Sequence, residues 1–436
     1  MKVLTQFYRY IFLVLILAIS HSLNASHGTS GSITYRCVDT NIGKYEITLN
    51  VLRYCYGVSP GNQNLQIQSA QLNTTISMGS PTIKEITPIC KVPDVSVPVV
   101  TNCPSGPIAG ISGLEKHTYK TTVVLGKNLG WALIGWGTCC REIGLSTITG
   151  AGGLGIWTQA AINTNVNNSS PIFNSDASNF VCFNKENWFD LSAKDSFDPR
   201  YVVIDGNYIE RDSLVYELYA PFTAQAANIN NAINLQNPGV TYVSGYSANS
   251  FFISSPPMNF NKNTGILRFT PTVMTTSLTG IVVKEYRAIP SSNGKTYTRQ
   301  LVGHITRDQT FSMNYCEEMN NGGVVADSSN VEFVVTPNLV RTCRAKGNKI
   351  MMRFTMPNGN SLKVKDASII NQSEISNYSF KSSVKLTGNT STALVEFKFD
   401  RNFATKGYEF KVKVYYCNSL GISIENYIPL NVLFSN

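Results

Sequence analysis

The sequence has 436 residues, of which 43% are hydrophobic and 14% charged, and its formal net charge is +9. Ordinary apolar content with few charges excludes a chain that is disordered throughout. The basic residues are scattered, with no basic stripe interleaved with stacking aromatics, which argues against nucleic-acid binding. A mild attraction to acidic polysaccharide or a lipid surface is the alternative to a merely solvated basic surface.

The N-terminal segment has the parts of a secretory signal peptide. Lys2 and Arg9 precede an apolar run from Ile11 to Ile19, and Ala25 supplies a small residue for cleavage. That run is too short to span a bilayer, and no second one follows. We expect residues 1–25 to be removed. The mature protein is then exported across the inner membrane, has no transmembrane segment, and is secreted or lies at the cell surface.

Strand patterns dominate the rest of the chain. Tyr45, Ile47, Leu49 and Val51 alternate with polar residues, and the same alternation recurs at residues 409–416. Turn signals separate such runs, at residues 41–43, 60–62, 320–323 and 357–360, and the glycine-rich stretch 150–155 also reads as a turn. One weak helical candidate, rich in Ala and Asn, spans residues 222–235.

Two polar stretches predict the domain boundaries. The first covers residues 163–170 and the second residues 317–330, and both are rich in Asn and Ser. We therefore expect an all-β protein of three tandem Ig-like or cadherin-like β-sandwich domains stapled by disulfides. The predicted parts are a β-sandwich at 26–168, a cadherin-like or Ig-like β-sandwich at 169–316, a linker at 317–330 and an Ig-like β-domain at 331–436.

Ten cysteines follow the predicted signal peptide, and their even number in an exported chain predicts disulfides. They are Cys37, Cys55, Cys90, Cys103, Cys139, Cys140, Cys182, Cys316, Cys343 and Cys417. Metal ligation is the alternative, but there is no Cys-x-x-Cys pair and there are only four histidines. The predicted bridges are Cys90–Cys103, Cys343–Cys417, Cys182–Cys316, and one bridge each from Cys37 and Cys55 to Cys139 and Cys140. A vicinal Cys139–Cys140 disulfide is the alternative for the adjacent pair.

Residues 26 to about 316 contain, in order, a series of short motifs. In the first half these are Ser26-His27-Gly28, residues 31–37, residues 45–49, Arg53-Tyr54-Cys55, Cys90, Cys103, Tyr119, Trp131, Trp136, Cys139-Cys140-Arg141 and residues 168–171. In the second half they are Phe180-Val181-Cys182, residues 212–216, residues 245–248, Phe260-Asn261, Gly265, Phe269-Thr270-Pro271, residues 284–287 and Arg307-Asp308.

This series resembles the N-terminal module of large secreted surface proteins of Bacteroidetes, which are associated with gliding motility or type IX secretion and carry PKD-like or cadherin-like β-sandwiches. The resemblance implies an exported β-protein. The family usually has a compact Asp-Pro-Asp-Gly-Asp-Ser-Leu run, whereas here residues 200–211 separate Asp198-Pro199 from Asp212. In place of the family's long tail of repeats and sorting domain, the sequence continues into one further β-domain.

The acidic residues around this insertion are candidate calcium ligands, because Ca²⁺ takes six to eight oxygen ligands. They are Asp195, Asp198, Asp205, Glu210 and Asp212. The alternative is a solvated acidic loop. No other cofactor is expected.

Nothing in the sequence predicts catalytic residues. His27, His117 and His304 lack the contexts of a zinc protease or a serine hydrolase. Trp131, Trp136, Trp157 and Trp188 could form a sugar-stacking platform, although aromatics at alternating strand positions are more often core.

We therefore expect a non-catalytic adhesin or extracellular structural protein that interacts with other surface proteins or extracellular polysaccharide. A carbohydrate-binding module protein is the alternative, and a secreted hydrolase is the third hypothesis.

Overall fold

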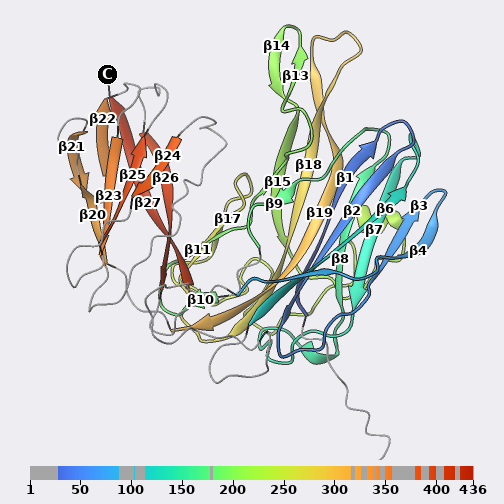
Figure 1. Ribbon diagram of the computed structural model, residues 1–436, viewed down its shortest axis with the longest axis horizontal. Coiled ribbons are helices and arrows are strands. Elements are labelled where there is room, and N and C mark those ends of the chain that lie inside the picture. Colours follow the sequence, from blue (N-terminus) through green and yellow to red (C-terminus); the bar gives the residue numbers. More distant parts are fainter. Residues whose placement is uncertain are drawn as a thin grey trace, which may run out of the picture.

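The computed structural model describes residues 28–87, 103, 113–176 and 180–315 with their side chains, and further along the chain the backbone of strands between 320 and 435. Nearly every element in these residues is a β-strand (Figure 1), which confirms the predicted all-β class. Among the described residues, no helix is both long and apolar enough to cross a membrane. The predicted signal peptide lies outside them.

Twelve strands join in the largest sheet, which we name the main sheet. They are β1 (Gly28–Asp39), β2 (Lys44–Tyr54), β3 (Asn64–Ser69), β4 (Asn73–Ser77), β5 (Thr82–Glu85), β6 (Leu114–Val124), β7 (Trp131–Thr138), β8 (Ile156–Asn163), β10 (Phe180–Cys182), β15 (Asp212–Tyr219), β18 (Thr276–Pro290) and β19 (Tyr297–Asn314).

The main sheet divides into two branches at β19. One edge of β19 pairs with β18 along most of its length. Its other edge pairs in turn with β8 at residues 303–305, with β1 at 307–309 and with β10 at 312–314. The branches β8-β7-β3-β4 and β1-β2-β6-β5 therefore leave the same strand separately.

The two branches face each other across the main hydrophobic core. A Cβ atom on Gly31 of β1 would come within 2.8 Å of the ring of Trp136 on β7, so only glycine permits this approach of the two layers. The alternating residues Tyr45, Ile47, Leu49 and Val51 of β2 are all buried, as the sequence pattern predicted. A turn at Gly43, where φ is +64°, joins β1 to β2 at a predicted turn.

The predicted boundary between domains 26–168 and 169–316 is wrong, because β19 pairs with both branches of the first segment. Phe251 and Phe311 also belong to the same core cluster as Ile33. The described residues between 28 and 315 therefore share one main core, although the two branches do resemble the predicted first sandwich.

The polar stretch expected as an exposed break lies inside this unit. Asn168, Ser169 and Ser170 are all buried. Ser170 Oγ accepts a hydrogen bond from the amide of Tyr35 at 2.9 Å, and Ser169 Oγ accepts one from the amide of Cys37 at 3.1 Å. These serines thus satisfy backbone amides of β1, which a linker would not do.

Smaller elements cover the ends and faces of the main sheet. They are β9 (Ile172–Phe173) paired with β12 (Ala193–Lys194), β11 (Asn187–Asp190) with β17 (Ile266–Phe269) and β16 (Asn259–Phe260), β13 (Tyr201–Ile204) with β14 (Asn207–Glu210), and the short helices η1 (Ala151–Gly153) and α2 (Ile229–Ile233). Helix α2 is the helical part of the predicted segment 222–235, and the side chain of Asn228 accepts a bond from the amide of Asn231 at its start. Helix η1 lies in the predicted turn between β7 and β8.

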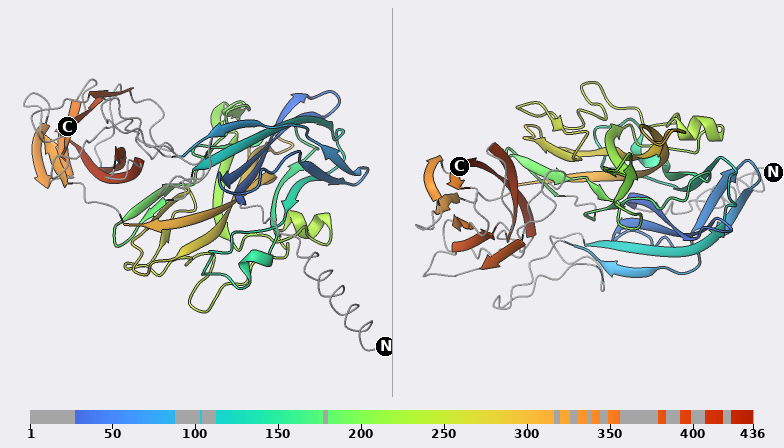
Figure 2. Two further views of the ribbon diagram at one scale, coloured as in Figure 1. Left: turned by 60° about the horizontal axis from the view of Figure 1, so that its bottom comes forward. Right: turned by 90° about the horizontal axis from the view of Figure 1, so that it is seen from above.

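The C-terminal strands form two four-stranded sheets, drawn in orange and red in Figures 1 and 2. One contains β20 (Asn320–Val325), β23 (Lys349–Thr355), β25 (Thr392–Lys398) and β24 (Ser379–Ser383). The other contains β21 (Val331–Thr336), β22 (Leu339–Cys343), β27 (Ser423–Ser435) and β26 (Gly407–Cys417).

The predicted alternating strand at residues 409–416 lies within β26, so that prediction is confirmed. Strand β20 lies inside the predicted linker 317–330 and includes the predicted turn 320–323, so both of those predictions fail at residues 320–325. The predicted turn at 357–360 lies outside the described residues.

Candidate functional site

The insertion at residues 200–211 is a β-hairpin that projects from the main sheet (Figure 1). Tyr201 pairs with Glu210 and Ile204 with Asn207, so the hairpin folds back on itself and brings its two ends together. Asp198 precedes the hairpin and Asp212 begins β15 directly after it. The inserted residues therefore leave the two acidic ends as neighbours in space.

Four carboxylates meet at the base of this hairpin, and we name them the acidic cluster: Asp195, Asp198, Asp212 and Glu285. One oxygen atom of each lies within 4.8 Å of the others. Three of the four were predicted as calcium ligands. The fourth, Glu285, comes from β18, and the sequence analysis assigned it no role at the site.

Asp205 and Glu210 are not in the cluster, so their prediction as ligands is wrong. Asp205 occupies the turn of the hairpin with φ of 50°, and Glu210 is exposed and lies 3.7 Å from Arg200. A strand advances about 3.3 Å per residue, so the turn lies roughly 13 Å from the base.

Strand register explains how Glu285 reaches the cluster. In the antiparallel pair of β15 and β18, Asp212 lies opposite Arg287 and Leu214 lies opposite Glu285. The sequence motif 284–287 contains both β18 residues, but only the pairing of β15 with β18 links them to the acidic stretch.

Arg287 neutralises part of the cluster. Its Nε lies 2.7 Å from Asp212 Oδ1, and its Nη2 lies 2.8 Å from Asp212 Oδ2 and 2.6 Å from Asp198 Oδ2. It also donates to the carbonyl of Asn167 at 2.7 Å and to the side-chain oxygen of Asn168. These contacts raise the pKa of Arg287 against the effect of burial, so it remains a cation.

Glu285 is fully buried and only partly satisfied. Its Oε2 accepts a bond of 2.6 Å from Asn168 Nδ2, whereas its Oε1 has no hydrogen-bond partner. Burial raises the pKa of Glu285 well above its usual value, and the charges of Asp195 and Asp212 raise it further against the opposing bond from Asn168.

Asp195, like Glu285, has a buried carboxylate oxygen without a hydrogen-bond partner, which is its Oδ1. Burial, followed by the charges of Asp198 and Asp212, raises the pKa of Asp195 to about 6. An unsatisfied buried oxygen is costly, so two such oxygens in one cluster need an explanation.

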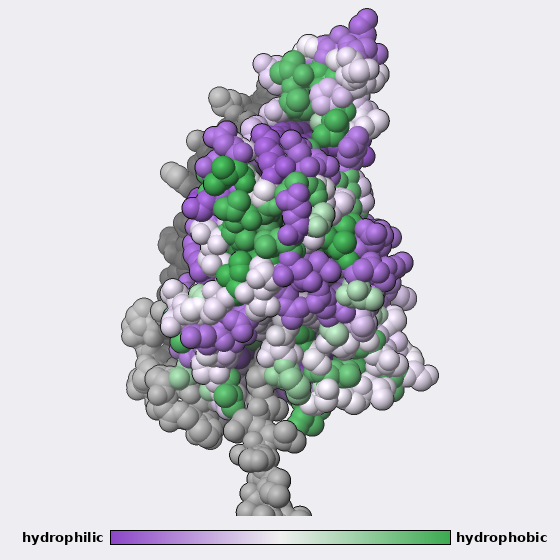
Figure 3. Space-filling model, turned by 90° about the vertical axis from the view of Figure 1, so that its right-hand side faces the viewer, coloured by the Kyte–Doolittle hydropathy of each residue, from purple (hydrophilic) through white to green (hydrophobic). Residues whose placement is uncertain are grey.

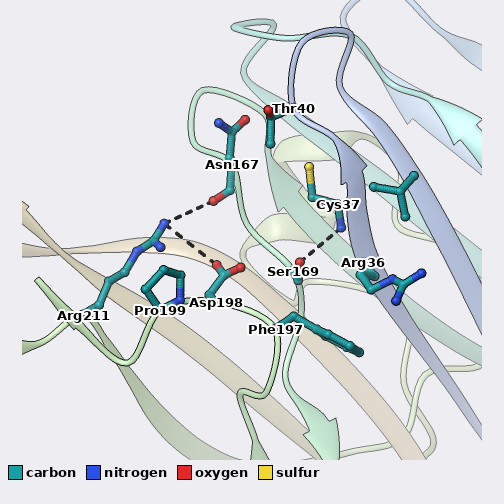
Figure 4. A pocket seen from close by; sticks show the side chains of 10 residues that line it. Arg36, Cys37, Thr40, Asn167, Ser169, Phe197, Asp198, Pro199 and Arg211 are labelled. Atoms are coloured by element: carbon teal, nitrogen blue, oxygen red, sulfur yellow. Dashed lines mark hydrogen bonds and ion pairs between the residues drawn. The ribbon is translucent and has the colours of Figure 1, made fainter.

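A pocket of about 610 Å³ opens beside the cluster (Figure 4). Two of its lining residues connect it to the cluster: Asp198 is a member of the cluster, and Arg211 lies close to two of its carboxylates. Arg211 Nη2 lies 4.0 Å from Asp198 Oδ2, and its Nε lies 3.9 Å from Asp212 Oδ2. The thiol of Cys37 also lines the pocket, and burial followed by the charge of Asp198 raises its pKa.

The cysteine pairing differs from the prediction. Cys55 bonds to Cys103, which excludes Cys90–Cys103 and removes Cys55 as a partner for the adjacent pair. Cys139 bonds to Cys140, the alternative that the sequence left open. Strand β7 ends at Thr138, so the strand alternation that was expected to separate these two side chains does not extend to them.

Cys37 is a free thiol in the structure. It lies opposite Tyr45 near the β1–β2 turn, while Gly28 at the other end of β1 bridges to Arg141. Nine residues of strand, roughly 30 Å, therefore separate Cys37 from the Cys139–Cys140 pair.

Cys182 is disulfide-bonded. The predictions for Cys90, Cys316, Cys343 and Cys417 fall on side chains outside the described residues.

The tryptophans do not form the sugar-stacking platform considered from the sequence, and the favoured core interpretation is confirmed for three of the four. Trp136, Trp157 and Trp188 are buried, and Trp131 is packed against a small cluster that includes Leu133. Of the predicted noncatalytic histidines, His117 and His304 are buried, and burial lowers the pKa of each. His27 lies outside the described residues.

Exposed aromatic and aliphatic side chains occur instead at the projecting hairpin. Tyr201, Val203 and Tyr208 of β13–β14 are exposed, as is Tyr297 at the adjacent end of β19. We name these four residues the contact tip. In Figure 3 the tip is at the top, where hydrophobic and hydrophilic residues lie side by side.

Arg299 of β19 attaches the base of the projecting hairpin. Its Nη1 donates to the carbonyl of Arg211 at 3.0 Å, and its Nη2 donates to that of Glu210 at 2.8 Å. The β13–β14 hairpin is thereby attached to the β18–β19 hairpin at the end next to Asp212, while Val203 and Tyr208 lie further along it toward the turn.

Comparison with known proteins gives little further guidance. No family model and no curated protein matches the chain. Similar solved structures include protocadherin gamma B2 extracellular cadherin domains 3–6, at 10% identity over 93% of this chain and 92% of that one, with a TM-score of 0.17. A marsupial T cell receptor matches at 9% identity over 92% and 98% of the two chains, with a TM-score of 0.16. TM-scores this low support no inference about the fold or function of this protein.

Proposed function

We propose that the protein is a non-catalytic interaction protein of the cell surface or extracellular space, and that the contact tip touches its partner. The observation that carries the proposal is the exposure of Tyr208, at 78%, on a hairpin that stands away from the main sheet. Tyrosine is enriched in protein interfaces because it buries a large area while its hydroxyl remains hydrogen-bonded.

The shape and rigidity of the tip support binding. The rings of Tyr201 and Tyr208 meet edge to face with centroids 6.4 Å apart, and the guanidinium of Arg200 lies 5.1 Å from the ring centroid of Tyr201. Tyrosine loses little conformational entropy when it contacts a partner, and this pair is already ordered. The predicted export and the resemblance to secreted Bacteroidetes surface proteins agree with a role outside the cell.

The favoured partner is another surface protein. Val203 adds an exposed aliphatic side chain to the tyrosines, and a mixed aromatic and aliphatic patch suits a protein surface better than a sugar. Carbohydrate binding is the second candidate, carried by the exposed ring of Tyr208, on which a sugar could stack.

The test uses the labelled mature protein and source-organism cells that lack it, with binding measured by flow cytometry. Tyr208→Ser should weaken binding at least about tenfold, as expected for a central interface tyrosine. Tyr315→Ser is the matched control, because Tyr315 is 76% exposed and lies in the same unit. Equal binding by Tyr208→Ser and Tyr315→Ser would show that the contact tip does not touch the partner.

A glycan array and protease treatment of the cells separate the two candidates. Loss of binding after protease treatment supports a protein partner. Binding to a defined glycan that Tyr208→Ser abolishes would replace it with carbohydrate recognition.

A further inference from the structure

The charges of the acidic cluster do not balance. When all four carboxylates are ionised, as metal ligands must be, they contribute four negative charges, and the guanidinium groups of Arg287 and Arg211 contribute two positive ones. Two negative charges remain in a region where Glu285 is fully buried and Asp212 is almost so. Buried charge of this kind is stable only when it is paired, coordinated to a metal or neutralised by protons.

The unpaired oxygen atoms belong to the two carboxylates, Glu285 and Asp195, that form no ion pair with Arg287. Arg287 contacts Asp198 and Asp212, while Oε1 of Glu285 and Oδ1 of Asp195 have no hydrogen-bond partner. On Asp198, the ion pairs with Arg287 and Arg211 both involve Oδ2. The cluster therefore combines two carboxylates that are paired with Arg287 and two that each offer an oxygen atom without a hydrogen-bond partner.

We propose that Asp195, Asp198, Asp212 and Glu285 bind one Ca²⁺ ion at the base of the projecting hairpin. A divalent ion matches the two remaining negative charges. Oxygen atoms within 4.8 Å of one another suit Ca²⁺, whose bonds of about 2.4 Å place opposite ligands about 4.8 Å apart. Mg²⁺ demands near-ideal octahedral geometry and usually keeps several waters, so a site supplied by four protein carboxylates suits Ca²⁺ better.

The ion would join three separate parts of the chain. Asp195 and Asp198 precede the hairpin, Asp212 follows it, and Glu285 comes from β18. Binding therefore fixes both ends of the hairpin to the main sheet. The pocket beside Asp198 gives solvent access to the cluster. This site does not depend on which partner the tip contacts, so either proposal can fail without the other.

The primary test titrates the EDTA-treated, dialysed full mature chain with Ca²⁺ and, separately, with Mg²⁺. Calorimetry should show one Ca²⁺ per chain at millimolar concentration or below, and the melting temperature should rise by several degrees. Mg²⁺ should bind at least about tenfold more weakly. Absence of both heat and a thermal shift at about 5 mM Ca²⁺, several times the dissociation constants of roughly 0.1–1 mM found for weak extracellular sites, would overturn the proposal.

Variants locate the site. Glu285→Gln keeps the shape of the side chain and removes one buried negative charge, so it should fold, melt at least as high as wild type in EDTA, and lose the response to Ca²⁺. Asp195→Asn should likewise lose the response. Asp205→Asn and Glu210→Gln are the matched controls and should keep it, because both residues lie outside the cluster. A normal Ca²⁺ response in Glu285→Gln would overturn the assignment.

A second readout follows the hairpin directly. Hydrogen exchange of residues 200–211 should slow when Ca²⁺ is added to wild type and should not change in Glu285→Gln. Exchange that is unaffected by Ca²⁺ in wild type would overturn the proposed link between the ion and the hairpin.

Discussion

Two buried arginine sites in the main sheet differ in how their charges are matched. Arg141 and Asp308 are 2% and 1% exposed, and their Nη1 and Oδ2 atoms lie 2.6 Å apart. This pair has one charge of each sign, and Arg141 also donates to the carbonyl of Phe222 at 2.8 Å. Arg287 instead meets an excess of carboxylates.

The comparison shows what distinguishes a structural ion pair from a candidate binding site. Both sites contain an arginine held by carboxylate and carbonyl oxygens, so the arginine alone does not distinguish them. The Arg141–Asp308 pair contains one charge of each sign, whereas the acidic cluster, with its carboxylates ionised, retains two negative charges. Removing a charge should therefore have different consequences at the two sites.

The largest effect is expected at the neutral pair. Arg141→Met leaves Asp308 as an uncompensated buried charge, which should lower the free energy of unfolding by about 3–5 kcal/mol. Urea denaturation followed by tryptophan fluorescence measures this, because all four tryptophans lie between residues 131 and 188. Added Ca²⁺ should restore nothing. The double variant Arg141→Met/Asp308→Leu should recover part of the loss, and a loss below about 1 kcal/mol in the single variant would contradict a buried pair.

Arg287→Met should cost somewhat less, about 3 kcal/mol in EDTA, because Asp198 is next to the pocket and can be partly hydrated. Here Ca²⁺ should recover part of the loss, since the cluster becomes more negative without Arg287. The same urea experiment with and without Ca²⁺ measures the recovery. If Ca²⁺ acts equally on Arg287→Met and Arg141→Met, the distinction between the two sites is wrong.

His304 is a third buried titratable site, and unlike the two arginine sites it contains a neutral side chain. Burial, followed by the charge of Lys284, lowers its pKa to about 3, while the unfolded chain keeps a value near 6.5. Between these values only the unfolded state binds the proton, so the free energy of unfolding falls as the pH falls. The expected loss is about 2 kcal/mol at pH 5 relative to pH 7.

His304→Gln should reduce this pH dependence by that amount, as measured by urea denaturation of both chains at pH 5 and pH 7. His117 is present in both chains and cancels in the comparison. An unchanged difference between the two pH values would show that His304 takes up a proton in the folded protein.

The smallest effect on stability is expected from Arg211→Gln. Arg211 is partly exposed and lies 3.9–4.0 Å from the carboxylates, so its loss should change the free energy of unfolding by less than about 1 kcal/mol. The apparent affinity for Ca²⁺ should nevertheless increase several-fold, because one competing positive charge is removed. Calorimetric titration measures this, and a weaker affinity would show that Arg211 supports the ion site.

Local patterns in the sequence determined the elements but only part of their arrangement. The alternation in β2 and the turn at Gly43 depend on neighbouring residues, and both were predicted correctly. Asp195, Asp198 and Asp212 were predicted as candidate ligands because they lie close together along the chain. The hairpin between them was recognised only as an insertion.

Tertiary structure decided what the sequence pattern left open. Glu285 and Arg287 join the cluster through the register of β15 with β18, more than 70 residues apart. Asn168 to Ser170 have the composition of a linker, yet they are buried because their side chains bond to β1 and to the cluster. Cys55 bonds to Cys103, 48 residues away, rather than to either adjacent cysteine, because a disulfide requires side chains that the fold brings together and not neighbours in the chain.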